Sequence, residues 1–162
     1  MQKIIVIYHS RGGTTRSMAE LVAEGARNYG VETDVRDAGF VDVDQLIDYS
    51  GVIIGSPVYY GSMAAEIKKL VDESVKLHGR LDGKVGAAFA SSGNLAGGNE
   101  STILDILHVL LVHGMIIHGD PKGDHYGPVA VGNCDERAAD ECLRLGGRVA
   151  ELVKKLAAEP SA

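Results

Sequence analysis

The sequence contains very little cysteine. Cys134 and Cys142 are the only two among 162 residues, and their positions fit no spacing typical of a metal site or a redox motif. If both lay on one helix, they would be about 12 Å apart, which is too far for a disulfide bond. We therefore expect free thiols in a reducing compartment and no bound metal.

Long apolar runs and clusters of basic residues are also missing. The apolar segments are short and interrupted, and Met1 leads directly into a strand-like segment without a signal-peptide pattern, which favours a cytoplasmic location. A total of 16 basic and 22 acidic residues gives a net charge of −6. Without a basic surface, neither nucleic acid nor a membrane is expected as a partner.

The chain has enough apolar sequence for one folded domain. Apolar residues make up 45% of it, and we expect a single domain over residues 1–159 with a short tail at 160–162. Strand-like runs occur at residues 4–8, 31–36, 52–55, 85–90 and 115–118. Helical patterns alternate with them at residues 14–29, 63–77, 98–113 and 135–158, and a short helix is expected at 43–49. This alternation predicts an α/β fold with a doubly wound, five-stranded parallel sheet in the order 2-1-3-4-5.

The turn between the first strand and the first helix is rich in hydroxyl groups and glycine. It comprises Ser10, Arg11, Gly12, Gly13, Thr14 and Thr15. Free N–H groups and the helix dipole favour an anion at such a place, and glycine allows close approach of the backbone. The turn lacks the glycine patterns of dinucleotide and nucleoside triphosphate sites, so a monophosphate is favoured. The alternative is an ordinary capped turn.

Two further loops should meet this turn, because ligands of such sheets bind beyond the carboxyl ends of the strands. After the third strand come Pro57, Val58, Tyr59, Tyr60 and Gly61, whose adjacent tyrosines offer a face for a flat ring. After the fourth come Ser91, Ser92, Gly93, Asn94, Leu95 and Gly97, which offer polar groups and close backbone approach. The alternatives are partly exposed packing tyrosines and a flexible glycine-rich loop.

A monophosphate site, an aromatic face and a polar loop together describe a site for a mononucleotide with a planar heterocycle, and FMN fits best. His125 lies in the loop after the fifth strand, which could reach the same end of the sheet. It is a candidate to close over the edge of the flavin and donate a hydrogen bond. An exposed loop histidine is the alternative.

The chain resembles a shortened form of the WrbA-like NAD(P)H:quinone oxidoreductases, which have a flavodoxin-like fold. The resemblance is carried by residues 10–15, 55–61, 91–100, 113–117 and 127–130. It implies that residues 10–15 hold the FMN phosphate, that residues 58–60 flank the isoalloxazine, and that residues 91–97 line its pyrimidine side and the ribityl chain. The electron donor implied is NADH or NADPH.

Two departures from the family limit what the resemblance implies. Val112 stands where family members commonly have the first of two successive histidines, so no histidine role is carried over to it. The segments at 41–48, at 77–84 and before Asp120 are shorter than in typical members. Those longer segments contribute to the family's tetramer and nicotinamide pocket.

Two functions remain open. The first is an FMN-dependent reductase that passes electrons from NADH or NADPH to a quinone or similar small acceptor, as a homodimer or homotetramer. The second is a flavodoxin-like electron carrier between partner proteins, which the missing insertions favour. Carriers of this size often have an acidic rim, whereas these loops contain Arg11 and no acid before Glu100. The sequence lacks residues that three other classes of α/β protein require, which argues against a phosphoryl-accepting receiver domain, a serine hydrolase and a low-molecular-weight phosphatase.

Overall fold

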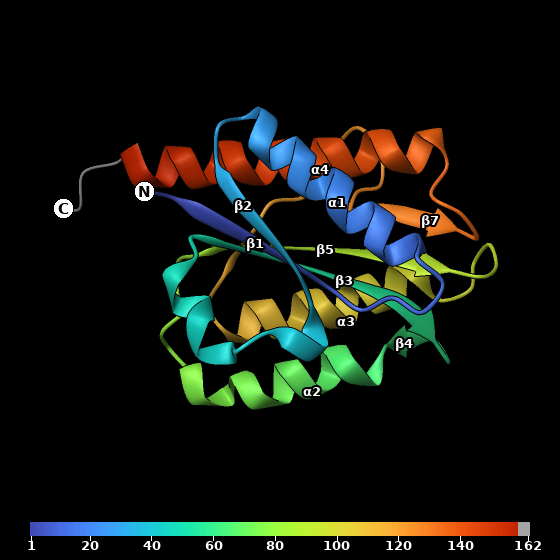
Figure 1. Ribbon diagram of the computed structural model, residues 1–162, viewed down its shortest axis with the longest axis horizontal. Helices are drawn as coiled ribbons and strands as arrows, with labels where there is room; N and C mark the ends of the chain where they lie inside the picture. The colour runs from blue at the N-terminus through green and yellow to red at the C-terminus, as the bar shows by residue number, and fades with distance from the viewer. Residues whose placement is uncertain (159–162) are drawn as a thin grey trace.

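A parallel sheet lies between two layers of helices in the computed structural model, which describes residues 1–158 (Figure 1). The expected tail at 160–162 lies outside the described residues. The strands are β1 (Lys3–Tyr8), β2 (Glu32–Asp37), β3 (Gly51–Tyr59), β4 (Ser62–Met63), β5 (Val85–Ser92), β6 (Ile116–Ile117) and β7 (Val129–Val131). The helices are α1 (Thr14–Asn28), α2 (Ala65–Glu73), α3 (Asn99–Val112) and α4 (Glu136–Ala158), with 3-10 helices at Ala38–Phe40, Val43–Asp48 and Ser74–Leu77.

The predicted sheet order is confirmed. The main path runs β2-β1-β3-β5-β6, which is the expected 2-1-3-4-5 once two short strands are set aside. Of these, β4 pairs antiparallel with β3, and β7 runs parallel to the end of β5.

Three elements differ most from their predicted boundaries. Strands β3 and β5 continue past residues 55 and 90, because they pair with each other as far as Pro57 and Ser91, and β5 also pairs with β7. The single helix expected over residues 63–77 is divided into β4, α2 and a 3-10 helix. As a result, Pro57 to Tyr59 and Ser91 to Ser92 belong to strands and not to loops.

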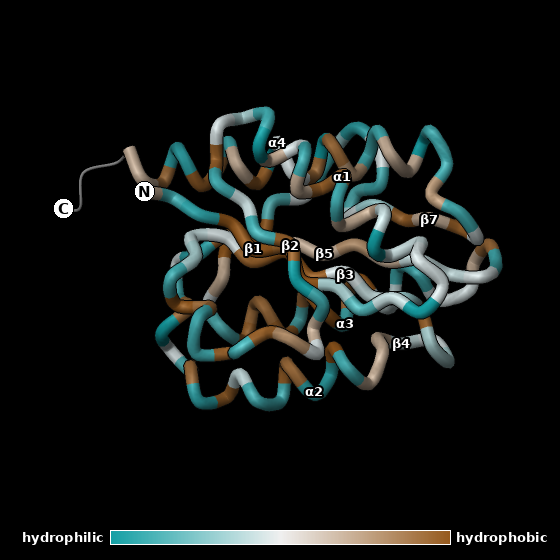
Figure 2. The backbone as a smooth tube through the Cα atoms, viewed as in Figure 1, coloured by the Kyte–Doolittle hydropathy of each residue, from teal (hydrophilic) through white to brown (hydrophobic). Residues whose placement is uncertain are grey.

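Each face of the sheet has its own hydrophobic core. Along β1, Ile4 and Val6 pack into one cluster with residues of α1 and α4, whereas Ile5 and Ile7 pack into the other with residues of α2 and α3. This is the alternation of side chains along a strand that is buried on both faces. Figure 2 shows the central strands as the apolar middle of the molecule.

Helices α1 and α4 cover one face of the sheet with their backbones in contact (Figure 1). A Cβ atom on Gly25 of α1 would lie 2.0 Å from the carbonyl oxygen of Leu143, and one on Gly146 of α4 would lie 1.9 Å from that of Val22. No side chain fits at either position, because packed interiors leave no space for an overlap of this size. Glycine at these two positions therefore sets how closely α1 approaches α4.

The two cysteines lie on the same side of the sheet as α4. Cys134 precedes the helix and Cys142 is buried within it, so the two residues do not share a helix, and both are free thiols. Burial raises the pKa of both thiols, which keeps them protonated and poorly reactive. No helix within residues 1–158 has the length and apolar character needed to cross a bilayer.

His113 joins the end of α3 to the 3-10 helix Ser74–Leu77. The Ser74 hydroxyl donates to the carbonyl oxygen of Val71 at 2.6 Å, so at 2.7 Å it accepts a hydrogen bond from Nε2 of His113. The other ring nitrogen, Nδ1, is buried and has no hydrogen-bond partner among the described residues. Burial, together with nearby His78, lowers the pKa of His113, so the ring is neutral in the folded protein near neutral pH.

We expect this buried ring to make the protein less stable in acid. Because the pKa of His113 is lowered on folding, the unfolded chain binds the proton more readily, and the stability present above pH 6.5 is lost as the pH falls toward the lowered pKa. In urea unfolding at a series of pH values, His113→Gln should lose up to about 1.4 kcal/mol less per pH unit than the wild type. His108→Gln, on an exposed part of α3, should keep the wild-type slope, and equal slopes for all three proteins would contradict this account.

Candidate functional site

The turn between β1 and α1 is shaped to receive an anion. Gly13 precedes α1 with a φ of +97°, and its backbone N–H donates to Oγ of Ser10 at 3.0 Å. No side chain caps α1 and no acid occupies its first turn, so the positive end of the helix dipole is not compensated there. The space beside Gly12 and Gly13 is open for at least 4 Å from a Cβ position. An anionic group can therefore reach the backbone amides directly.

Two hydroxyl groups connect this turn to the residue after β7 and to β5. Thr14 Oγ1 donates to the carbonyl oxygen of Gly132 at 2.8 Å. Thr15 Oγ1 and Ser91 Oγ are 2.8 Å apart and share a buried hydrogen bond. The turn is thus held against the carboxyl ends of the strands that the sheet order brings together.

A cleft of about 200 Å³ opens above these strand ends. Its lining comes from all three predicted segments, namely Ser10, Arg11, Gly12, Thr14, Thr15, Pro57, Val58, Tyr59, Ser91, Ser92 and Gly93, together with Gly132. Gly132 was missed by the sequence analysis. Its signal was a glycine directly after a strand, and it adopts a φ of +72° there. Predicted residues that do not line this cleft are Gly13, Tyr60, Gly61, Asn94, Leu95, Gly97 and His125.

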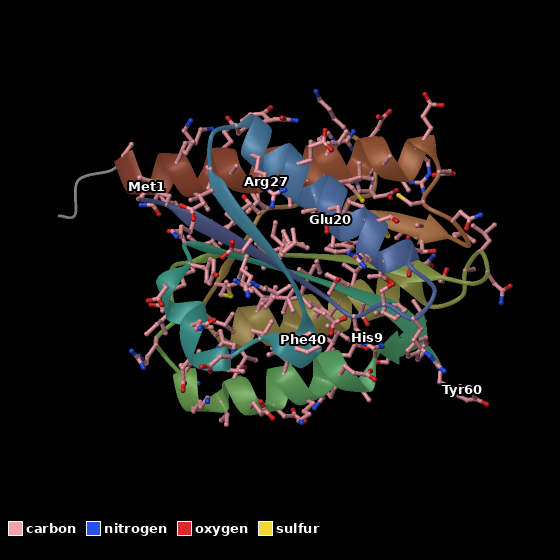
Figure 3. All side chains as sticks on the ribbon, in the orientation of Figure 1. Met1, His9, Glu20, Arg27, Phe40 and Tyr60 are labelled. Atoms are coloured by element: carbon pink, nitrogen blue, oxygen red, sulfur yellow. The ribbon has the colours of Figure 1, made fainter. Side chains whose placement is uncertain are left out.

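Tyr60 and Gly61 form the two-residue turn of a β-hairpin. Tyr59 pairs with Ser62 across it, and both turn residues have positive φ, +51° for Tyr60 and +83° for Gly61. Such turns match the twist of the strands but favour asparagine or glycine in the first position. The Tyr60 side chain is fully exposed and projects away from the molecule (Figure 3). Tyr59 lies at the cleft instead, with the Arg11 guanidinium carbon 6.0 Å from its ring centroid.

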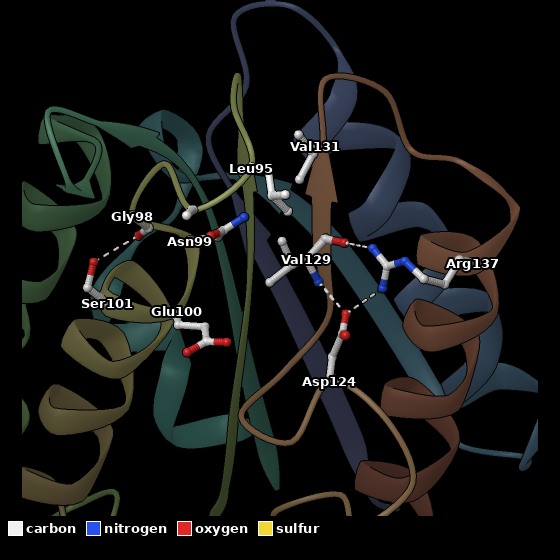
Figure 4. Close-up of a pocket in the computed structure, with 10 residues that line it drawn as sticks. Leu95, Gly98, Asn99, Glu100, Ser101, Asp124, Val129, Val131 and Arg137 are labelled. Atoms are coloured by element: carbon white, nitrogen blue, oxygen red, sulfur yellow. Dashed lines mark hydrogen bonds and ion pairs between the residues drawn. The ribbon is translucent and has the colours of Figure 1, made fainter.

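The loop at 93–98 is ordered by its own hydrogen bonds. Ser92 Oγ donates to the carbonyl oxygen of Asn94 at 2.8 Å and accepts from the Asn99 side-chain amide at 3.0 Å. Leu95 is 86% exposed, and Ala96 has a φ of +54°. This loop also borders a second, wider hollow of about 630 Å³, lined by Leu95, Ala96, Gly98, Asn99, Glu100, Ser101, Asp124, Val129, Val131 and Arg137 (Figure 4).

The polar groups of the second hollow are largely engaged with each other. Asp124 accepts hydrogen bonds from the backbone N–H of Val129 and from Arg137, both at 2.9 Å, and Arg137 also donates to the Val129 carbonyl oxygen (Figure 4). The hydrogen bonds from Arg137 hold the loop before β7 against α4. Because Arg137 is already paired with Asp124, the first cleft is the better site for an anion.

His125 lies away from the cleft, in the loop before β7. Its Nδ1 donates to the carbonyl oxygen of Asp120 at 2.7 Å. Asp120 in turn accepts from Nε of Arg144 on α4 at 2.6 Å. These bonds place His125 on the α4 side of the molecule, so its predicted contact with a flavin remains a prediction that this geometry does not support.

Comparison with known proteins identifies the family. A model of the flavodoxin domain matches residues 5–105. The chain belongs to the flavodoxin family. It is 36% identical to an NAD(P)H dehydrogenase (quinone) of Archaeoglobus fulgidus, over 96% of this chain and 100% of the relative, and 38% identical to a flavodoxin of Aquifex aeolicus, over 94% and 88%. Among solved structures, a WrbA-like flavodoxin from Agrobacterium tumefaciens superposes with a TM-score of 0.81 at 28% identity, covering 96% of this chain and 99% of the other.

We expect Tyr60→Asn to stabilise the protein in the absence of any ligand. Tyr60 buries no surface, and asparagine adopts a positive φ at lower cost, so the free energy of unfolding should rise by about 0.5–1 kcal/mol in urea titrations. Tyr126→Asn serves as the control, because Tyr126 is about half exposed and does not have a positive φ, so this change should not stabilise the protein. A loss of stability on Tyr60→Asn would show that the tyrosine makes a favourable contact in the hairpin.

Proposed function

We propose that this protein is an FMN-binding oxidoreductase that transfers electrons from NADH or NADPH to a quinone or similar acceptor. One observation carries the proposal. The uncapped N-terminal end of α1, the hydroxyl groups of the β1–α1 turn and Tyr59 all meet at the same cleft. FMN would supply the redox chemistry when bound. The protein's part is to hold the nucleotide, orient its ring and admit the two substrates in turn.

The phosphate would be held by the β1–α1 turn. The amides of the first turn of α1 and the hydroxyl of Ser10, which keeps its proton because its oxygen accepts from the Gly13 amide, would donate to the phosphate oxygens. The open space beside Gly12 allows close contact, and Thr14 would fix the turn through its hydrogen bond to Gly132. Thr15 would support the site from beneath, because its hydroxyl is already engaged by Ser91. Arg11 adds positive charge at the rim.

The ring would lie between the ends of β3 and β5. Pro57, Val58 and Tyr59 form one wall of the cleft, and Ser92 and Gly93 form part of the other. The first wall offers apolar and aromatic surface for a flat ring, and the second offers a hydroxyl group and close backbone approach. Tyr60 stands on the same hairpin, fully exposed, within one residue of this wall.

The relatives support both functions that the sequence left open. One is named an NAD(P)H dehydrogenase (quinone) and another a flavodoxin, at similar identity. We favour the reductase because Arg11, at the mouth of the cleft, would attract the phosphates of a nicotinamide nucleotide. The electron carrier is the second candidate, favoured by the shortened internal segments at 41–48, at 77–84 and before Asp120.

We further infer a cytoplasmic location and a homodimer or homotetramer. The two free, protonated cysteines suit a reducing compartment. Self-association is supported by large apolar side chains that are exposed at the end of α3 and on β6, namely Leu111, Val112 and Ile116.

Absorption spectroscopy tests the proposed reaction. The protein reconstituted with FMN should show a bound flavin spectrum that bleaches on anaerobic addition of NADH or NADPH and recovers on addition of a quinone. A flavin that stays oxidised with both nucleotides would support the electron carrier. Absence of FMN binding would reject both functions.

We expect the Ser10 hydroxyl to act on the phosphate in particular. Ser10→Ala should weaken FMN binding about tenfold, the cost of roughly one hydrogen bond to a charged group, and should leave the binding of riboflavin, which lacks the phosphate, nearly unchanged. Quenching of flavin fluorescence measures both affinities. Ser17→Ala is the control, since the Ser17 hydroxyl bonds the Gly13 carbonyl and does not line the cleft. Equal losses for FMN and riboflavin would place the phosphate elsewhere.

A further inference from the structure

His9 is a nearly buried titratable group beside the cleft, and the proposed function has not used it. It directly follows β1, and its backbone N–H donates to the Gly55 carbonyl oxygen at 3.3 Å. Its side chain is 14% exposed, and Nε2 has no hydrogen-bond partner among the described residues. The nearest acid is Glu66 in the first turn of α2, with Oε2 at 3.5 Å from Nε2. A buried polar atom left in this way calls for an explanation.

The His9 ring also touches the aromatic wall of the cleft. It meets Tyr59 edge to face, with ring centroids 6.4 Å apart and planes inclined by 76°. This is a favourable geometry for an aromatic pair. Tyr59 thus contacts His9 at the end of β1 and the Arg11 guanidinium of the following turn.

We propose that His9 is a positioning residue, which sets the Tyr59 ring in the cleft by an edge-to-face contact and is itself held by Glu66 on α2. The proposal rests on the proposed FMN site. An N–H on Nε2 would point toward the Glu66 carboxylate, so the imidazole is held between α2 and Tyr59.

The charges around His9 favour this role. Glu66 faces it from α2, Tyr59 from β3, and Arg11 reaches the same tyrosine from the turn. On the β2 side, Asp37 pairs in register with Tyr8, and its carboxylate already accepts from the Gly39 amide at 2.9 Å. Glu66 is about half exposed, so solvent screens its pair with His9 and the contribution of the pair is modest. The aromatic contact with Tyr59 is therefore the larger part of the role.

Three variants separate the two contacts of His9. His9→Phe keeps an aromatic edge against Tyr59 and cannot titrate, His9→Gln keeps a donor for Glu66 and loses the ring, and Glu66→Gln removes the charge. His9→Gln should bind FMN about threefold more weakly than the wild type, because the aromatic contact with Tyr59 is lost. His9→Phe should restore most of that affinity, and Glu66→Gln should change it less than His9→Gln does, because the pair is partly screened by solvent.

Near-ultraviolet circular dichroism of the tyrosines gives a second measurement that needs no FMN. The wild type, His9→Phe and the control His108→Gln should share a tyrosine signal that is changed in His9→Gln. A His9→Gln protein with the FMN affinity and the tyrosine signal of the wild type would overturn the proposal. A wild type that binds no FMN would reject the proposed function instead, and the dichroism comparison alone would then decide whether His9 sets Tyr59.

Discussion

The contact between the backbones of α1 and α4 is the constraint on which the site depends. Gly25 and Gly146 leave no space for a side chain, so α1 lies at one fixed distance from α4. The N-terminal end of the same helix carries the anion-binding amides. If a larger residue forced the helices apart, the Ser10 to Thr15 turn would move away from β3 and β5, and the cleft would lose one of its walls. A packing requirement at one end of α1 therefore controls binding geometry at the other.

The cleft itself follows from the order of the strands. Because β1 lies between β2 and β3, its connection and that of β3 leave in opposite directions, and the ends of β1, β3 and β5 are left uncovered at the same edge. The hydrogen bond between Thr15 and Ser91 ties the first of these ends to the last. His9 and Tyr59 make a second connection, between β1 and β3. The walls of the cleft are thus linked in pairs by side chains, not by the sheet alone.

Much of the fold and part of the site could be predicted from local sequence. Helical and strand periodicity identified the sheet order and four helices, and hydroxyl and glycine content identified the turn at Ser10 to Thr15. The extension of β3 to Tyr59 could not be predicted, because it arises from pairing with β5 and β4. Gly132 was missed since it reaches the turn only through the position of β7. The flavin contact of His125 stays a prediction: proximity to the same end of the sheet was inferred, whereas His125 donates to the Asp120 carbonyl oxygen and Arg144 donates to the Asp120 carboxylate, which directs the loop toward α4.

The bond from Thr14 to Gly132 has a consequence for how the protein is made. The two residues are 118 positions apart in the sequence, and their hydrogen bond fixes the turn that connects β1 to α1. During synthesis, β1, β3 and α1 can all emerge long before β7, and contacts of such long range form slowly because a large loop must close first. A nascent chain would therefore have the anion-binding turn without the strand that holds it in place. Cofactor capture would come late in biogenesis, as the step that follows completion of the fold rather than one that guides it.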